Sequence, residues 1–345
     1  MNTKHTLFAL LLAISSASGW SQSKIQVTMD LNKVIHDQVT VTVKVPVNSA
    51  STLLYSVPKI IPGTYSEDDY GKYIEQFKAL DANGKPLTVT KTDVNTWQIN
   101  NANKAKTITY QVNDTYDIED THEIFSPAGS NIEAGKNFMI NTHAFIGYFE
   151  GFAQNPYELT ILHPEQLWGA TALTDLDASK NKDVFVINRY ASLVEHPIMY
   201  AQPDYTTFTV QGMEILIAVY SPNRKVTAAS ITPEMKQMMT AQKNFLGDFN
   251  ATKKYAVLLY LSDNTKPDAE GFGALEHPTS TTVVMPEMLP IDELKEQLKD
   301  VVSHEFFHIV TPLTIHAKEI ANFDYNNPKM SQHLWMYEGV TEYFA

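Results

Sequence analysis

The sequence predicts an α+β protein in which a β-rich, sandwich-like N-terminal domain precedes a domain of mixed strands and helices. Two observations lead to this prediction. Short runs of alternating apolar and polar residues, separated by turn residues, fill most of the chain up to about residue 220. After 221–223 (SPN), apolar strands alternate with segments of helical periodicity. We therefore expect a signal peptide at 1–19, a β-rich domain at 20–221 and a second domain at 222–345.

The strands predicted for the first domain are short and regularly spaced. They are 24–29, 39–45, 87–90, 107–112, 157–162, 206–210 and 213–219. Turn-forming residues separate them, as at 81–86 (DANGKP). Many short strands with regular turns are typical of a β-sandwich or a related all-β domain.

The second domain is predicted to contain three helices and two buried strands. A helix is expected over 232–247, with Thr232 as its N-cap and Pro233 at its first position. The apolar runs 255–261 and 281–285 predict strands, and helical patterns follow at 291–310 and 334–344.

The N-terminus has the pattern of a secretion signal. Lys4 and His5 precede the apolar run 7–14, and small residues follow at 15–19. The apolar run is too short to span a bilayer, and no second run of spanning length occurs. We expect cleavage after Gly19 or Ser21, export to the periplasm or the exterior, and no membrane span in the mature chain.

Composition excludes several classes of function. The net charge of −13 argues against a nucleic-acid partner, because phosphate binding relies on clustered Lys and Arg. The chain has no cysteine, which excludes disulfides, thiolate metal sites and cysteine proteases. The oligomeric state is left open.

The stretch 304–308 (HEFFH) carries the most chemical information. Positions i and i+4 share one face of a helix, so His304 and His308 can bind one ion, with Glu305 beside it. The segment 301–310 is apolar nearly all round, so the helix should be buried. Unpaired buried polar groups are costly, and one shared Zn²⁺ would satisfy both imidazoles and the carboxylate. In this arrangement Glu305 takes a proton from the attacking water.

A third zinc ligand is needed, and Glu338 is the leading candidate. It lies inside the apolar helical segment 334–344, where an ion would keep its carboxylate charged. Glu319 and Asp324 are rivals, but their surroundings are polar and loop-like. Glu342 follows Glu338 by four residues, so it could hydrogen-bond the far nitrogen of a bound imidazole.

The second chemical feature is the segment 271–278 (GFGALEHP) before the strand 281–285. Gly273 and Ala274 allow close approach of another backbone. The following strand is a plausible sheet edge, so a peptide could lie along it by strand addition. Glu276 could bind a free α-amine. On the residues alone, a plain Gly-rich loop before a strand remains the alternative.

These motifs together resemble the glycyl aminopeptidase family of zinc peptidases, relatives of aminopeptidase N and thermolysin. The resemblance rests on 304–308 (HEFFH), on 334–343 (LWMYEGVTEY), on 273–277 (GALEH) and on 58–65 (PKIIPGTY). It implies that His304, His308 and Glu338 bind one zinc ion, that Glu305 is the general base and that Glu276 anchors the free N-terminus of a peptide. It also implies a thermolysin-like second domain and a preference for small N-terminal residues such as Gly and Ala.

Two departures from the family pattern are visible. The residues after the motif are 309–314 (IVTPLT) rather than the family's usual Trp-Asn pair, so we expect the details of the substrate subsites to differ. The sequence ends at Ala345, shortly after the expected ligand helix, so we expect a further helical lobe beyond it. We expect the Tyr or His that stabilises the transition state to lie in that lobe, and Tyr337 and Tyr343 to be core aromatics instead.

Two other functions are compatible with the same residues. One is a zinc endopeptidase, in which Glu276 does not anchor an amine. The other is an exported zinc-binding scaffold without catalytic activity. An N-terminally blocked substrate separates the first from an aminopeptidase, and zinc content without turnover identifies the second.

Overall fold

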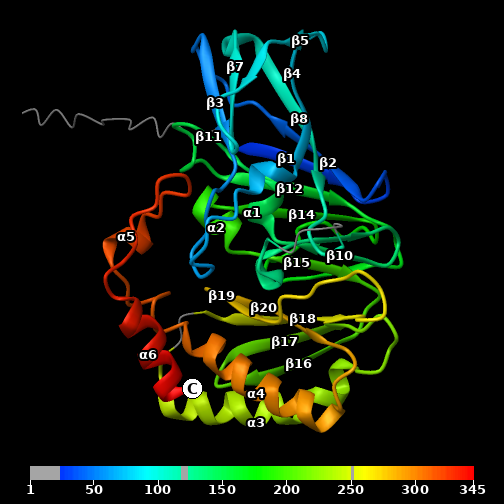
Figure 1. Cartoon of the computed structure of the whole chain (residues 1–345), viewed down its shortest axis with the longest axis vertical. Helices are drawn as coiled ribbons and strands as arrows, with labels where there is room; N and C mark the ends of the chain where they lie inside the picture. The colour runs from blue at the N-terminus through cyan, green and yellow to red at the C-terminus, as the bar shows by residue number, and fades with distance from the viewer. Residues whose placement is uncertain (1–23, 118–122, 250–251) are drawn as a thin grey trace, which may run out of the picture.

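The computed structural model describes residues 24–117, 123–249 and 252–345 (Figure 1). The predicted signal peptide at 1–19 lies outside these residues. The upper part of the molecule in Figure 1 consists of β-sheets with short helices, and the lower part has a sheet covered by long helices. This arrangement confirms the α+β prediction with a β-rich N-terminal part.

The β-rich part contains three sheets. The first is formed by β1 (Ile25–Asp30), β2 (Gln38–Lys44), β4 (Ile74–Asp81), β5 (Pro86–Leu87), β8 (Ala105–Asn113), β12 (Tyr157–Leu162) and β14 (Lys182–Ile187). The second contains β9 (Asn131–Glu133), β10 (Asn137–Ile140), β13 (Trp168–Ala170) and β15 (Ile198–Ala201). The third contains β3 (Thr52–Ser56), β6 (Val89–Lys91), β7 (Thr96–Asn100) and β11 (Tyr148–Phe149). The spatial orders are β14-β12-β1-β2-β8-β4-β5, β13-β15-β10-β9 and β11-β3-β7-β6.

Alternation along the strands decides which side chains enter the core of this part. In β2 the valines at 39, 41 and 43 are fully buried, while the residues between them are more exposed. An aromatic group extends this core, with the Phe77 ring stacked on Trp97 at 4.9 Å and on Tyr110 at 5.6 Å. Short helical segments complete this part: η1 (Tyr70–Tyr73), η2 (Ala102–Lys104), η3 (Ser126–Ala128), α1 (Thr142–Phe145) and α2 (Tyr190–Val194).

A five-stranded sheet forms the lower part of the molecule. Its strands are β16 (Tyr205–Val210), β17 (Met213–Tyr220), β18 (Lys254–Ser262), β19 (Gly273–His277) and β20 (Ser280–Pro286). The order is β16-β17-β18-β20-β19, with β17, β18 and β20 parallel and the two edge strands antiparallel. The central strands are buried on both faces: Val257 and Leu259 contact the helices, whereas Ala256 and Leu258 face the β-rich part. This explains their continuous apolar sequences.

The remaining helices are α3 (Ala228–Leu246), α4 (Ile291–Phe307), α5 (Lys318–Ala321) and α6 (Leu334–Phe344). Figure 1 shows α3 and α4 side by side beneath the sheet, with α6 next to the end of α4. The predicted start of α3 at Thr232 is wrong. The N-cap is Thr227, five residues earlier: its side chain accepts a hydrogen bond from the Ser230 amide, and its own amide donates one to the Ser230 hydroxyl.

The five-stranded sheet begins before residue 221, since β16 pairs with β17 and β17 pairs with β18, the strand that follows α3. The division of the chain at residue 221 stays a prediction. Within the part of the chain that the structure describes, no helix combines the length and apolar character needed to cross a bilayer.

Candidate metal centre

Helix α4 packs one face into the core of the lower part, and this packing fixes the position of the histidine motif. Leu294, Leu298 and Val302 recur every four residues and are buried against α3 and the sheet. His304 lies on the other face and is partly exposed, while His308 is 2% exposed. α4 ends at Phe307, three residues before the predicted end, yet His308 retains helical backbone angles and so stays in register with His304.

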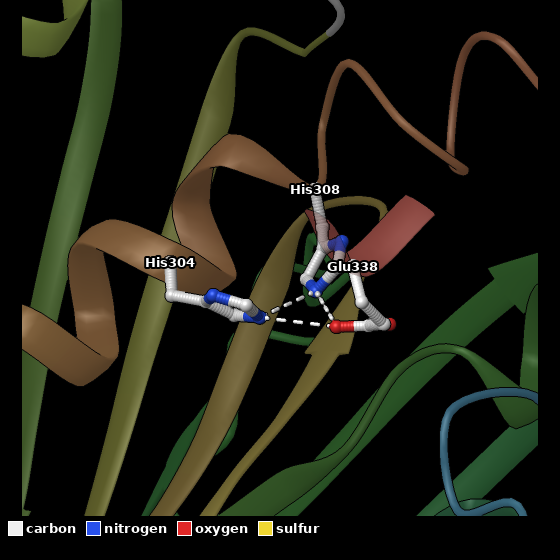
Figure 2. A group of neighbouring side chains, drawn as sticks. All are labelled: His304, His308 and Glu338. Carbon is white, nitrogen blue, oxygen red and sulfur yellow. Dashed lines mark hydrogen bonds and ion pairs between the residues drawn. The ribbon is translucent and has the colours of Figure 1, made fainter. Parts of the chain in front are cut away.

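Helix α6 brings Glu338 to the same place. The Thr341 hydroxyl lies 3.3 Å from the Thr311 hydroxyl in the turn after α4, and the Phe344 ring stacks on Phe307 at 5.8 Å. The Tyr337 hydroxyl accepts a hydrogen bond of 2.8 Å from the Ala317 amide. These contacts fix α6 against α4 and direct Glu338 toward the two histidines (Figure 2).

The three predicted ligands converge on one point. His304 Nε2 lies 3.2 Å from His308 Nε2 and 3.3 Å from Glu338 Oε2, and His308 Nε2 lies 3.7 Å from the same oxygen. In a tetrahedral site with bonds of about 2.0–2.1 Å, neighbouring ligand atoms are about 3.3 Å apart. Two imidazole nitrogens and one carboxylate oxygen at these separations fit a zinc ion.

Each of these three side chains has a further hydrogen-bond partner on its far side. Glu342 Oε2 lies 2.9 Å from His304 Nδ1, the contact that the four-residue spacing from Glu338 suggested. The carbonyl oxygen of Thr311 lies 2.8 Å from His308 Nδ1. Both partners favour a proton on Nδ1, which leaves the two Nε2 lone pairs directed at the shared point.

The partner of Glu338 comes from the β-rich part of the chain. The Tyr65 hydroxyl donates a hydrogen bond of 2.5 Å to Glu338 Oε1. Sequence reasoning gave Tyr65 no role, because nothing near it in the chain has metal-site spacing. The only available signal was the PGTY segment at 62–65, which contributed to the family resemblance.

Glu305 lies beside the three ligand atoms without being one of them. Its side chain is 7% exposed, and Oε2 is buried with no hydrogen-bond partner in the protein. Burial, reinforced by the Glu276 carboxylate, raises the pKa of Glu305 well above its usual value. A buried carboxylate oxygen with no protein partner is available to a water molecule or a substrate proton.

Glu276 extends from β19 toward the same cluster. Its carboxylate, that of Glu305 and an imidazole nitrogen of His308 lie within 4.8 Å of one another. Burial, together with the negative charge of Glu338, raises the pKa of Glu276 to about 7. Three carboxylates in this space repel one another, so the cluster favours cations.

The expectation that the strand 281–285 lies at the sheet edge is wrong, because β20 lies between β18 and β19. The preceding segment with Gly273 and Ala274 forms β19, which is the outermost strand of the five-stranded sheet. Gly273 and Ala274 pair with Val284 and Val283 on one side, and no strand pairs with the other edge in the described residues. A Cβ at Gly273 would lie 2.8 Å from the Phe125 ring, so this close approach requires glycine. The free edge can accept an extended chain.

The remaining pKa shifts follow from the same contacts. The hydrogen bond with Glu338 raises the pKa of His304 to about 9, whereas burial lowers the pKa of His308. Burial alone would raise the pKa of Glu338, but hydrogen bonds from His304 and Tyr65 outweigh it and leave the pKa below its usual value. A metal ion would replace the proton on His304 as the cation that Glu338 contacts.

A cavity of about 290 Å³ adjoins Glu276. Tyr65 and Gly63 form part of its wall on the β-rich side, and Leu313 and Tyr337 line the opposite wall. The rival ligands Glu319 and Asp324 are both exposed, and neither belongs to a metal-sized group within the described ranges. His277 is buried, and its Nδ1 lies 3.1 Å from the Glu195 carboxylate, so it packs away from the metal ligands.

Comparisons with known proteins found two family models and several solved structures that match this chain. Residues 26–202 match the family model of the Peptidase M61 N-terminal domain, and residues 297–345 match that of the M61 glycyl aminopeptidase. Among solved structures, an aminopeptidase N family protein from Idiomarina loihiensis matches with a TM-score of 0.80 and 20% identity, over 93% of this chain and 53% of that chain. Aminopeptidase A of Legionella pneumophila, solved with aspartic acid, gives a TM-score of 0.49 and 16% identity, over 83% and 34% respectively. No curated protein matches this chain in sequence.

The Idiomarina protein has the same fold over the region it shares with this chain. The chain spans about half the length of that protein. The predicted fold class, a β-rich N-terminal domain followed by the first part of a thermolysin-like peptidase domain, is therefore confirmed as an aminopeptidase N-like fold.

Proposed function

Because the chain belongs to the M61 glycyl aminopeptidase family, we propose that it is an exported, zinc-dependent aminopeptidase. One observation carries the proposal. The Glu276 carboxylate lies within 4.8 Å of the Glu305 carboxylate and of His308, which itself belongs to the His304, His308 and Glu338 group. A group that can bind an amine therefore adjoins a group that can bind a metal.

The metal would be held by His304 Nε2, His308 Nε2 and Glu338 Oε2. Two nitrogens and one oxygen form a common ligand set of catalytic zinc, and such sites keep a further position open. Zinc bound there would supply a Lewis acid that polarises a peptide carbonyl and lowers the pKa of water. Glu342 and the Thr311 carbonyl hold the two imidazole rings in the orientation that this binding requires.

Glu305 is the general base in this proposal. Its unpartnered Oε2 accepts a proton from the attacking water, and the same carboxyl group then protonates the leaving amine. Burial near Glu276 raises its pKa, which makes the carboxylate a stronger base than an exposed glutamate. The α4 backbone fixes Glu305 beside the histidines, so the proton moves over a short distance.

Glu276 anchors the free amine of the substrate. An α-ammonium group near Glu276 and Glu305 would offset the repulsion between their carboxylates, whereas an acylated N-terminus would not. The edge of β19 at Gly273 and Ala274 would pair with the substrate backbone. We propose peptides with a small N-terminal residue, Gly or Ala, as the first substrates to test.

The decisive experiment compares free and blocked substrates. Glycyl- and alanyl-arylamides are incubated with the protein beside their N-acetylated counterparts, with and without a zinc chelator. We expect chelator-sensitive hydrolysis of the free amines alone. An endopeptidase would cleave blocked peptides equally well, and zinc content near one per chain with no turnover would indicate a non-catalytic scaffold.

A variant of Glu305 tests the mechanism separately from the metal. Glu305→Gln keeps the shape of the side chain and removes the base, so we expect zinc content to stay unchanged while kcat falls about 10²–10⁴-fold. The control is Glu293→Gln, an exposed position in the first turn of the same helix. Near-normal turnover by Glu305→Gln would exclude this mechanism.

A further inference from the structure

We propose that Tyr65, a residue of the β-rich part, is a positioning residue of the metal centre that holds Glu338 in its ligating orientation. The inference rests on the proposed metal-dependent function. It assigns part of the site to a loop that lies 273 residues away from Glu338 in sequence.

The two oxygens of Glu338 have separate partners. Oε1 accepts the hydrogen bond from Tyr65 at 2.5 Å, while Oε2 faces His304 Nε2 at 3.3 Å and His308 Nε2 at 3.7 Å. The Glu338 side chain is 36% exposed, so packing alone leaves it free to rotate. Binding Oε1 to a fixed donor sets the direction of Oε2.

Tyr65 provides the outer hydrogen bond of the third ligand, Glu338, which neither α4 nor α6 provides. The outer partners of His304 and His308 are Glu342 and Thr311, which lie on α6 and on the turn after α4. Such outer partners fix ligand orientation, and losing one commonly costs 10- to 100-fold in metal affinity or activity. The Tyr65 hydroxyl completes the set for the third ligand.

The phenol is suited to this role because it stays a donor. A phenol hydroxyl is neutral at pH 7, since the ordinary pKa of tyrosine is about 10. A neutral hydroxyl can donate to Glu338 without competing for the metal as a charged group would.

The loop that carries Tyr65 is held on both sides. The amides of Lys59 and Ile60 donate to the Tyr325 carbonyl at 2.9 and 3.2 Å, and Asp68 donates its amide to the Lys59 carbonyl at 2.9 Å. Gly63, with a φ of +93°, packs so closely on β19 that a Cβ would lie 2.7 Å from Glu276 Oε2. The loop therefore contacts the amine-binding and the metal-binding residues together.

A purely structural role for Tyr65 explains less. The side chain is 48% exposed, and its ring makes no aromatic contact in the described part of the chain. Its backbone has a φ of +55°, a region that costs an aromatic residue energy unless surrounding contacts hold it there. A half-exposed tyrosine contributes little to a hydrophobic core. The hydrogen bond to Glu338 is therefore the contact that can offset the energetic cost of this backbone conformation.

The test measures zinc affinity directly. Dissociation constants for Zn²⁺ are obtained by competition with a chromophoric chelator for the wild-type protein, Tyr65→Phe, Glu338→Gln and the double variant. Tyr205→Phe is the matched control, since Tyr205 is also 48% exposed and lies in β16, away from the cleft. Thermal unfolding of each variant without metal checks that the fold is retained.

We expect Tyr65→Phe to weaken Zn²⁺ binding roughly 10- to 100-fold and Tyr205→Phe to leave it unchanged. In the Glu338→Gln background, Tyr65→Phe should change the affinity less than about twofold, because the carboxylate it acts through is absent. Wild-type affinity in Tyr65→Phe overturns the inference while leaving the proposed function standing. An equal loss in both backgrounds overturns it too, since Tyr65 would then act without Glu338. A wild-type protein that binds no zinc overturns both.

Discussion

Replacing Gly63 with alanine tests whether the loop of the β-rich part must touch the site. The added Cβ would lie 2.6 Å from Leu275 Cδ1 and 2.7 Å from Glu276 Oε2, where ordinary contacts are about 3.5–4.0 Å. Either the loop or these two side chains must therefore move by about 1 Å, and Glu276 is itself a site residue.

Two costs add in this variant. An L-residue at positive φ loses about 1–2 kcal/mol, and Gly63 has a φ of +93°. Forcing an extra carbon into a packed contact adds typically 1–3 kcal/mol. Gly84 is a control that separates the backbone cost from the packing cost. Its φ is also positive, at +76°, but nothing lies within 4 Å of the Cβ that a substitution would add. Gly84→Ala should therefore show the backbone cost alone.

The free energy of unfolding is measured by urea denaturation for both variants, and kcat/KM is measured on an alanyl-arylamide. We expect Gly63→Ala to lose about 1–3 kcal/mol more than Gly84→Ala. Turnover should fall by up to about 10²-fold in Gly63→Ala alone, the size of loss that a 1 Å displacement of a site residue can cause. Equal stability and equal turnover in the two variants would refute the claim that this loop constrains the site.

Two further predictions concern Glu276 and His143. Glu276→Gln should lower kcat/KM on free-amine arylamides roughly 10- to 100-fold, the value of a hydrogen bond to a charged group, and unchanged kinetics would rule out an amine anchor there. His143 is fully buried, and burial lowers its pKa to about 3, so only the unfolded chain takes up a proton as the pH falls below about 6.5. Wild-type stability should therefore decrease on acidification, and the stability deficit of His143→Gln at pH 7 should shrink by about 2 kcal/mol at pH 5. Urea denaturation at the two pH values, with the exposed His36→Asn as control, checks this, and a constant deficit would contradict it.

Local periodicity predicted the long helices and several regularly alternating strands, but it missed other strands of five to eight residues, such as β3, β4 and β14. β12 occupies 157–162 and α6 occupies 334–344, as their alternating and helical patterns indicated. The start of α3 was missed because Thr232 followed by Pro233 is a common helix start, while the actual N-cap depends on reciprocal hydrogen bonds between Thr227 and Ser230. Several short strands, such as β9 and β13, have three residues each and too little sequence to show alternation.

The site was predictable where its geometry follows from helix spacing. His304 and His308 lie four residues apart on α4, and Glu338 and Glu342 lie four residues apart on α6. Tyr65 was not predictable in this way. Its position depends on how the loop after β3 folds over β19, and no local pattern encodes a contact across 273 residues.

The balance of charge links the metal-binding residues and the amine-binding residues of the proposed site. The carboxylates of Glu276, Glu305 and Glu338 lie around two imidazoles, of which His308 is held neutral by burial. The negative charge of the three carboxylates exceeds the positive charge that the imidazoles can supply. A metal ion and a substrate ammonium would therefore each reduce the same repulsion between carboxylates. Because the two cations offset the same negative charge and repel each other, binding of one should weaken binding of the other, and by thermodynamic reciprocity the effect is mutual. Tyr65 contributes no charge to this balance, and this is why a neutral phenol, rather than a lysine or an arginine, can hold Glu338 without displacing the metal.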